Sequence, residues 1–171
     1  MSKKHRPGCR IWMGLLLCSF LSVCVAKASD QQDEKRQRKF DYFFYEGLKL
    51  KEAAQYDAAF DLFTHCMAID STDAAVRYEL CSFYMQMNRP EKALEVLRPA
   101  VAHRPDQFDY RMALANITRS LGMYGEAAEA FRALVKDFPK KKELNYYLAD
   151  ALTQSGEIGE AIDALDALEE R

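Results

Sequence analysis

Residues 80–105 read LCSFYMQMNRPEKALEVLRPAVAHRP, and this stretch decides the fold. Apolar side chains recur at three- and four-residue steps in two runs, one before and one after Asn88-Arg89-Pro90. This spacing is typical of an amphipathic α-helix, and a proline at the start of the second run suits a first helical turn. Pro105 follows the second run, where it would stop a helix. The stretch therefore predicts two helices joined by a short turn.

The same pattern repeats along the chain every 34 residues, without gaps. A column of alanines contains Ala59, Ala93, Ala127 and Ala161, and a column of small residues contains Gly47, Cys81, Ala115 and Ala149. A third column is large and apolar, with Phe63, Leu97, Phe131 and Leu165. Self-similarity at this period indicates a helix-turn-helix repeat whose copies stack on one another.

Together with Leu80 and Pro105, these columns resemble the tetratricopeptide-repeat family over residues 40–171. The resemblance implies an all-α fold, a right-handed superhelical solenoid of antiparallel helix pairs. About four 34-residue units are expected, at 40–73, 74–107, 108–141 and 142–171. The first unit lacks the closing proline, and the fourth stops about four residues short of a full period. Gly122 and Gly156 are expected in the left-handed turn that ends the first helix of their units.

The first 28 residues differ from the rest of the chain. An uncharged, mostly apolar run at 11–25 follows a basic head with Lys3, Lys4, Arg6 and Arg10. Ala26-Lys27-Ala28 then supplies the small-x-small pattern of a cleavage site. These features predict a signal peptide at 1–28, cleaved after Ala28, and an exported protein of the periplasm or envelope.

Two other interpretations of this segment are weaker. An uncleaved anchor is disfavoured because spanning a bilayer takes roughly 20 apolar residues, so no membrane insertion is expected after cleavage. Leu21-Ser22-Val23-Cys24 loosely resembles a lipobox, which makes a lipoprotein attached through Cys24 the alternative.

Cleavage would make the protein acidic. Residues 1–28 contain five Lys or Arg and no Asp or Glu, so their removal would change the formal net charge from −2 to −7. Bulk electrostatics then disfavours nucleic acid and anionic membranes as partners. The polar segment 29–39 is expected as a frayed helical extension or a flexible lead. Of the two remaining cysteines, Cys66 and Cys81, buried thiols are favoured over the disulfide that export would permit.

The sequence shows none of the residue patterns expected of an enzyme. The only histidines after residue 28 are His65 and His103. A zinc set that combined them with Cys66 and Cys81 would match no known ligand spacing. Gly122-Met123-Tyr124-Gly125 is better explained as a turn between helices than as a phosphate loop. We therefore expect no catalytic residues, no metal and no cofactor.

The family resemblance implies that the first helices of successive units line a concave groove that holds an extended peptide or a partner helix. The residues that would face it form three rows: Phe44, Tyr78, Met112 and Tyr146; Leu48, Ser82, Asn116 and Asp150; and Lys51, Met85, Arg119 and Thr153. All but Lys51 and Thr153 are candidate partner-binding residues. The alternative is that the rings of the first row pack against neighbouring helices and only stabilise the solenoid.

Some family members clamp acidic C-terminal tails with repeated lysines and asparagines. Phe44, Tyr78 and Met112 stand where such a clamp would place lysines, so this mode of binding is not expected.

These observations predict a non-catalytic scaffold that binds a protein or peptide in the bacterial envelope. Two alternatives remain open. The chain can be the N-terminal array of a longer protein with an effector domain beyond Arg171, or a structural subunit that self-associates through its C-terminal face. Both would explain Ile162, Leu165 and Leu168, which the sequence leaves without a following helix to cover them.

Overall fold

The computed structural model describes the backbone of residues 9–169 and the side chains of residues 31–168. This part of the chain forms eight helices. They are α1 (Cys9–Glu52), α2 (Tyr56–Ile69), α3 (Ala74–Gln86), α4 (Pro90–His103), α5 (Phe108–Ser120), α6 (Tyr124–Asp137), α7 (Glu143–Ser155) and α8 (Ile158–Glu169).

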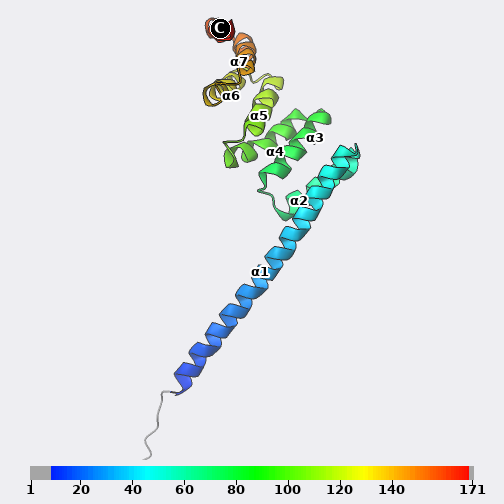
Figure 1. The fold of residues 1–171 in the computed structure, drawn as a ribbon, viewed down its shortest axis with the longest axis vertical. Helices are drawn as coiled ribbons and strands as arrows, with labels where there is room; N and C mark the ends of the chain where they lie inside the picture. Colours follow the sequence, from blue (N-terminus) through cyan, green and yellow to red (C-terminus); the bar gives the residue numbers. More distant parts are fainter. Residues whose placement is uncertain (1–8, 170–171) are drawn as a thin grey trace, which may run out of the picture.

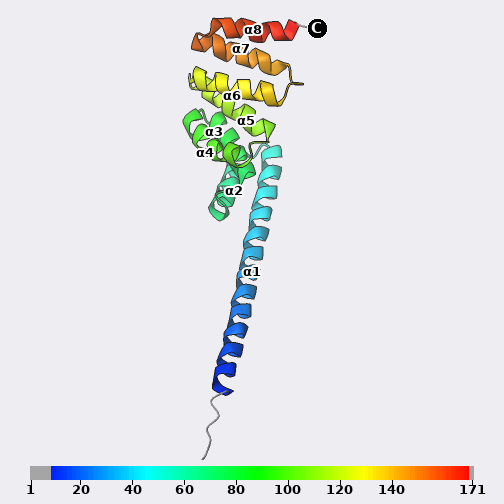
Figure 2. The same ribbon diagram turned by 90° about the vertical axis from the view of Figure 1, so that its left-hand side faces the viewer.

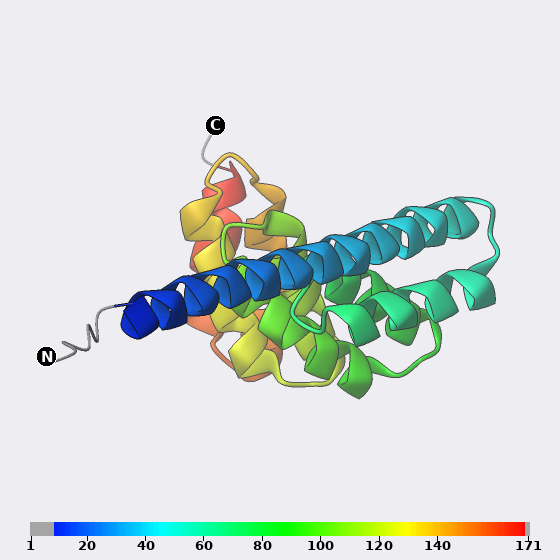
Figure 3. The ribbon, with the colours of Figure 1, turned by 90° about the horizontal axis from the view of Figure 1, so that it is seen from below.

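The helices pack as antiparallel pairs, and the pairs stack in chain order. Figure 2 shows the stack running from α1 and α2 to α7 and α8, with the N-terminal part of α1 projecting beyond it. Figure 1 and the view from below in Figure 3 show the same projection. The first helices of the pairs (α1, α3, α5, α7) form one layer and the second helices (α2, α4, α6, α8) form the other.

Side-chain bridges connect successive helices within each layer. In the first layer, Lys51 on α1 pairs with Glu79 on α3 at 2.6 Å, and Arg119 on α5 pairs with Asp150 on α7 at 2.7 Å. In the second layer, the same ion pair occurs twice, at positions one unit apart. It joins Arg98 to Glu126 at 3.1 Å and Arg132 to Glu160 at 2.8 Å.

The turn inside each pair contains one residue in the left-handed conformation, always at the same place in the 34-residue period. These residues are Ala54 (φ 58°), Asn88 (φ 55°), Gly122 (φ 74°) and Gly156 (φ 93°). The prediction for the two glycines is confirmed. Ala54 is a less favourable choice, because a Cβ atom in this conformation crowds the backbone and asparagine tolerates it better than alanine.

The alanine and large apolar columns form the core between the layers. Ala59, Ala93 and Ala127 are fully buried, as are Phe63, Leu97 and Phe131. A Cβ atom added to Gly47 would lie 3.2 Å from the Phe63 ring, so the small column allows close helix approach. Leu165 in the fourth unit is 42% exposed, because within the described residues no helix packs beyond α8.

The segment 31–39 continues α1 rather than forming a flexible lead. Its side chains are exposed, and Arg36 donates a hydrogen bond from Nη2 to the Ile69 carbonyl oxygen at 2.7 Å, at the end of α2. Sequence analysis missed this contact between the segment and the first pair.

The predicted cleavage after Ala28 and the alternative lipid attachment at Cys24 fall outside the residues whose side chains are described. Among residues 31–169, no helix has both the length and the apolarity needed to cross a membrane.

Candidate binding surface

The three predicted rows lie on the helices of the first layer, and we call the surface that they form the first-helix surface. Figure 2 places these helices one after another along the stack. The residues of one row have the same place in successive units, but their burial differs.

Two members of the first row act mainly in packing. The Phe44 ring stacks on Phe40 with centroids 6.1 Å apart and meets Phe63 edge-on at 5.9 Å. The Met112 side chain is half-buried against the core cluster around Phe131. Both side chains therefore contribute to packing.

The other two members of the first row differ in exposure, and Tyr78 packs against the core cluster around Leu97. Tyr78 on α3 is half-buried beside Tyr110 on α5, with ring centroids 4.8 Å apart. Burial, and then the nearby Asp109 carboxylate, raise the pKa of the Tyr78 hydroxyl. Tyr146 on α7 is 63% exposed. Within the described residues no first helix follows α7, so nothing stands beside Tyr146 as Tyr110 stands beside Tyr78.

The second and third rows supply the polar part of the surface. Leu48 packs against the core around Phe63, and Ser82 donates from Oγ to the Tyr78 carbonyl oxygen at 3.2 Å. Asn116 is half-buried, and Met85 is exposed. Arg119 and Asp150, which belong to different predicted rows, form the ion pair between α5 and α7. The basic side chains Lys51 and Arg119 are thus both fixed by carboxylates of the next first helix.

Two hollows open where first helices of the surface end. One, of about 290 Å³, lies between α1, α2 and α3 and is lined by Leu48, Lys51, Glu52, Tyr56 and Gln86. The other, of about 300 Å³, lies between α5, α6 and α7 and is lined by Arg119, Ser120, Tyr124, Asp150 and Gln154.

The two hollows have matching chemistry at matching places. A cation (Lys51, Arg119), a tyrosine (Tyr56, Tyr124) and a glutamine (Gln86, Gln154) each recur two repeat lengths, 68 residues, apart. The tyrosines and glutamines were not predicted from the sequence because they do not form columns through all four units: Pro90 stands at the place of the tyrosines and Ser120 at that of the glutamines. A comparison of alternate units would have found them, since Phe-Asp-Tyr at 40–42 also recurs at 108–110.

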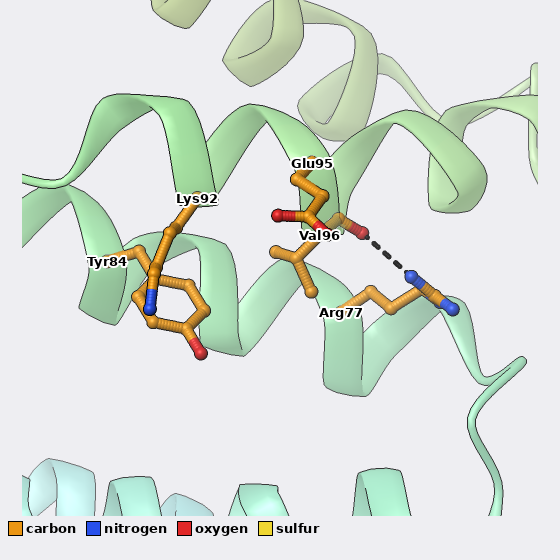
Figure 4. Close-up of a pocket in the computed structure, with 5 residues that line it drawn as sticks. All are labelled: Arg77, Tyr84, Lys92, Glu95 and Val96. Carbon is orange, nitrogen blue, oxygen red and sulfur yellow. Dashed lines mark hydrogen bonds between the residues drawn. The ribbon is translucent and has the colours of Figure 1, made fainter.

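A third hollow, of about 220 Å³, lies between α3 and α4, and Figure 4 shows its lining. Its two cations have partners within the protein. Arg77 donates from Nη1 to the Val96 carbonyl oxygen at 3.2 Å, and Lys92 lies over the Tyr84 ring at 6.0 Å. Arg77 also donates from Nε to the Ser71 carbonyl oxygen at 2.9 Å, which secures the loop before α3. We assign this hollow a structural role.

The two described cysteines are unreactive in character. Cys66 and Cys81 are free and buried, as predicted, and burial raises the pKa of each thiol to about 11. A thiol protonated at neutral pH is a poor nucleophile. Among the side chains of residues 31–168, no three His, Cys, Asp or Glu residues are grouped so that they could hold a metal ion.

The stacked helix pairs, the period of 34 residues and the left-handed turns define a class of protein, the α-helical repeat solenoids. Two family models described as tetratricopeptide repeat match residues 50–117 and 119–171. The chain belongs to the tetratricopeptide-repeat family, and the predicted all-α, right-handed solenoid is confirmed.

Several solved structures share this fold. The chain superposes on MamA AMB-1 with a TM-score of 0.71 and 21% sequence identity, over 77% of this chain and 72% of that one. A variant of MamA RS-1 gives a TM-score of 0.69 at 15% identity, over 76% of this chain and 73% of that one. At these identities the similarity concerns the fold alone.

One curated relative is similar in sequence. The chain is 25% identical over 125 residues to the Vi polysaccharide export protein VexE of Salmonella typhi. The match covers 73% of this chain and 19% of VexE, so the chain spans about a fifth of that relative's length.

Proposed function

We infer that this chain is a non-catalytic scaffold that binds a protein or peptide on its first-helix surface, in the bacterial envelope. Membership of the tetratricopeptide-repeat family supports the general role, a protein-interaction scaffold. The exposure of Tyr146 supports the finer assignment to this surface. Aromatic side chains gain the most from burial in an interface, because they contribute a large area at a small cost in conformational entropy.

The charges of the surface favour this assignment. Lys51 and Arg119 are held by Glu79 and Asp150, so a partner would meet an ordered surface rather than mobile side chains. Ordering before association lowers the entropic cost of binding.

A capture experiment with matched variants tests the proposal. The purified chain should retain a specific protein from the envelope fraction of its own organism. Tyr146→Ala should weaken that capture by about five- to thirtyfold, as expected for an aromatic anchor. Tyr42→Ala removes another exposed tyrosine, outside the three rows, and should leave capture unchanged. Equal capture by the wild type and the Tyr146 variant would refute the assignment to this surface.

The proposal includes export. The basic head, the apolar run at 11–25 and Ala26-Lys27-Ala28 support it. N-terminal sequencing of the protein expressed in a bacterium should begin at Ser29. A sequence that begins at Met1 would contradict the signal peptide, and a lipid on Cys24 would replace the soluble form by a lipoprotein.

A further inference from the structure

The last described helix, α8, carries an apolar stripe at the C-terminal end of the stack. Ile158, Ile162 and Leu165 form this stripe, and all three side chains are exposed. They follow one another at steps of four and three residues, which places them on one face of the helix. Figure 2 shows α8 beyond α7, at the end of the stack opposite to α1 and α2.

The stripe occupies the positions through which α2 receives α3 in the first unit. Tyr56, Phe60 and Phe63 of α2 are its equivalents, three repeat lengths earlier in the chain. Phe83 of α3 meets all three rings, with centroids 6.4, 5.8 and 5.9 Å away. The repeat therefore gives the stripe on α8 the geometry of a docking site for one more α-helix.

The opposite end of the stack is unsuited to fill this site. Leu80 and Phe83, which pack against the first pair, have Glu46 and Lys49 as their equivalents on α1. Glu46 and Lys49 form an ion pair at 2.9 Å. A second copy stacked head to tail would bury this ion pair against an apolar stripe, and such burial is costly. The first end of the stack is thus finished with polar groups, and the last end is not.

The charge beside the stripe favours a basic partner. Asp166 follows Leu165 and lies four residues after Ile162, so it stands at the edge of the stripe. Its equivalents on α4 and α6 are Arg98 and Arg132, which pair with glutamates of the next second helix at 3.1 and 2.8 Å. The sign of the charge is therefore reversed on α8, which contains no Lys or Arg. Two copies of α8 packed on each other would bring like charges together, whereas a helix with basic residues beside its apolar face would be attracted.

We propose that the C-terminal end of the stack is a second interaction site, which binds a basic amphipathic α-helix of a partner protein. The apolar face of that helix covers Ile158, Ile162 and Leu165, and a lysine or arginine on its flank pairs with Asp166. The site lies across the end of the stack rather than along either layer, and it does not depend on binding at the first-helix surface.

Two matched synthetic peptides, titrated by fluorescence anisotropy against the purified full chain, test the proposal. Both have about five helical turns and carry leucine and phenylalanine at three- and four-residue steps. One has lysines on both flanks of this face and the other has glutamates, which are about equally good helix formers. We expect the lysine peptide to bind about fivefold more tightly than the glutamate peptide.

Variants of the chain assign this binding to α8. Ile162→Gln should weaken binding of the lysine peptide by about five- to tenfold, because it removes apolar surface that the peptide would cover. Asp166→Lys should abolish or reverse the preference for the lysine peptide. Asp61→Lys on α2 is the control, since it changes the net charge equally at another exposed position and should keep the preference. The three substituted residues are exposed, so the variants should keep the wild-type circular dichroism spectrum.

Three results would overturn the proposal. The first is that neither peptide binds, or that both bind equally. The second is that binding is unaffected by both Ile162→Gln and Asp166→Lys, which would place the peptide elsewhere on the chain. The third concerns a second copy as the occupant, and sedimentation equilibrium tests it. We expect a monomer, whereas a dimer that Ile162→Gln dissociates would assign the end of the stack to self-association.

Discussion

The two layers of the solenoid are built from the same repeat but differ in their ion pairs and exposed side chains. The second helices carry a repeated ion pair, Arg98 with Glu126 and Arg132 with Glu160, and Arg132 also contacts Glu129 at 2.6 Å. The first helices use ion pairs to fix Lys51 and Arg119, and they leave Met85 and Tyr146 exposed. Under the proposed function the first layer meets the partner and the second layer faces solvent, and each prediction below tests one part of this contrast.

The largest effect is expected between the layers. Phe131 is fully buried and stacks on Tyr147 with centroids 5.7 Å apart, so Phe131→Ala should open a cavity and lower the free energy of unfolding by about 3–5 kcal/mol. Leu165→Ala at the equivalent place should cost much less, since Leu165 is 42% exposed. Urea denaturation measures both. If the two variants lost similar amounts of unfolding free energy, a partner or a second copy would have to cover α8 in solution.

A smaller effect is expected where the paired helices approach each other. Ala127 is fully buried in the alanine column, and Ala127→Leu should overpack the pair at a cost of about 1–3 kcal/mol. Ala133→Leu on the same helix is the control, because Ala133 is exposed. An unchanged melting temperature for Ala127→Leu would show that the assigned packing column is wrong.

Substitutions at two of the turns between the layers should change stability in opposite directions. Gly122→Ala should lower stability by about 1–2 kcal/mol, because it places a Cβ atom at φ 74° where no atom lies within 4 Å, so the cost is one of backbone conformation alone. Ala54→Gly should raise stability by about 0.5–1 kcal/mol, since Ala54 already adopts φ 58°. Thermal unfolding of the pair checks this. Stability changes of the same sign for the two variants would contradict the assignment of the same left-handed conformation to both turns.

The smallest effect is expected in the solvent-facing layer. Arg132 contacts three glutamates, yet the groups are largely exposed, and surface ion pairs contribute about 0–1 kcal/mol. Arg132→Met should therefore change stability by less than about 1 kcal/mol, and the difference should shrink at high salt. It should leave partner capture unchanged. Weakened capture would place the partner on the second layer.

The sequence predicted the fold well because each packing column depends on residues of one unit and its neighbour. The sequence could not predict that Tyr78 and Tyr146 differ in burial, because the two residues have the same place in the period. Their burial differs because Tyr110 lies beside Tyr78 and no equivalent residue lies beside Tyr146 within residues 31–168. The hollows were not predicted from the sequence either, because Tyr56 and Tyr124 match only between alternate units.

Site-specific photo-cross-linking in living cells tests most directly whether the first layer is the binding layer. A photoreactive phenylalanine derivative would replace Tyr146 on α7 in one variant and Glu129 on α6 in another; both side chains are exposed. We expect a discrete cross-linked product with a second protein from position 146 and none from position 129. A product from position 129 alone would contradict the account and assign binding to the second helices.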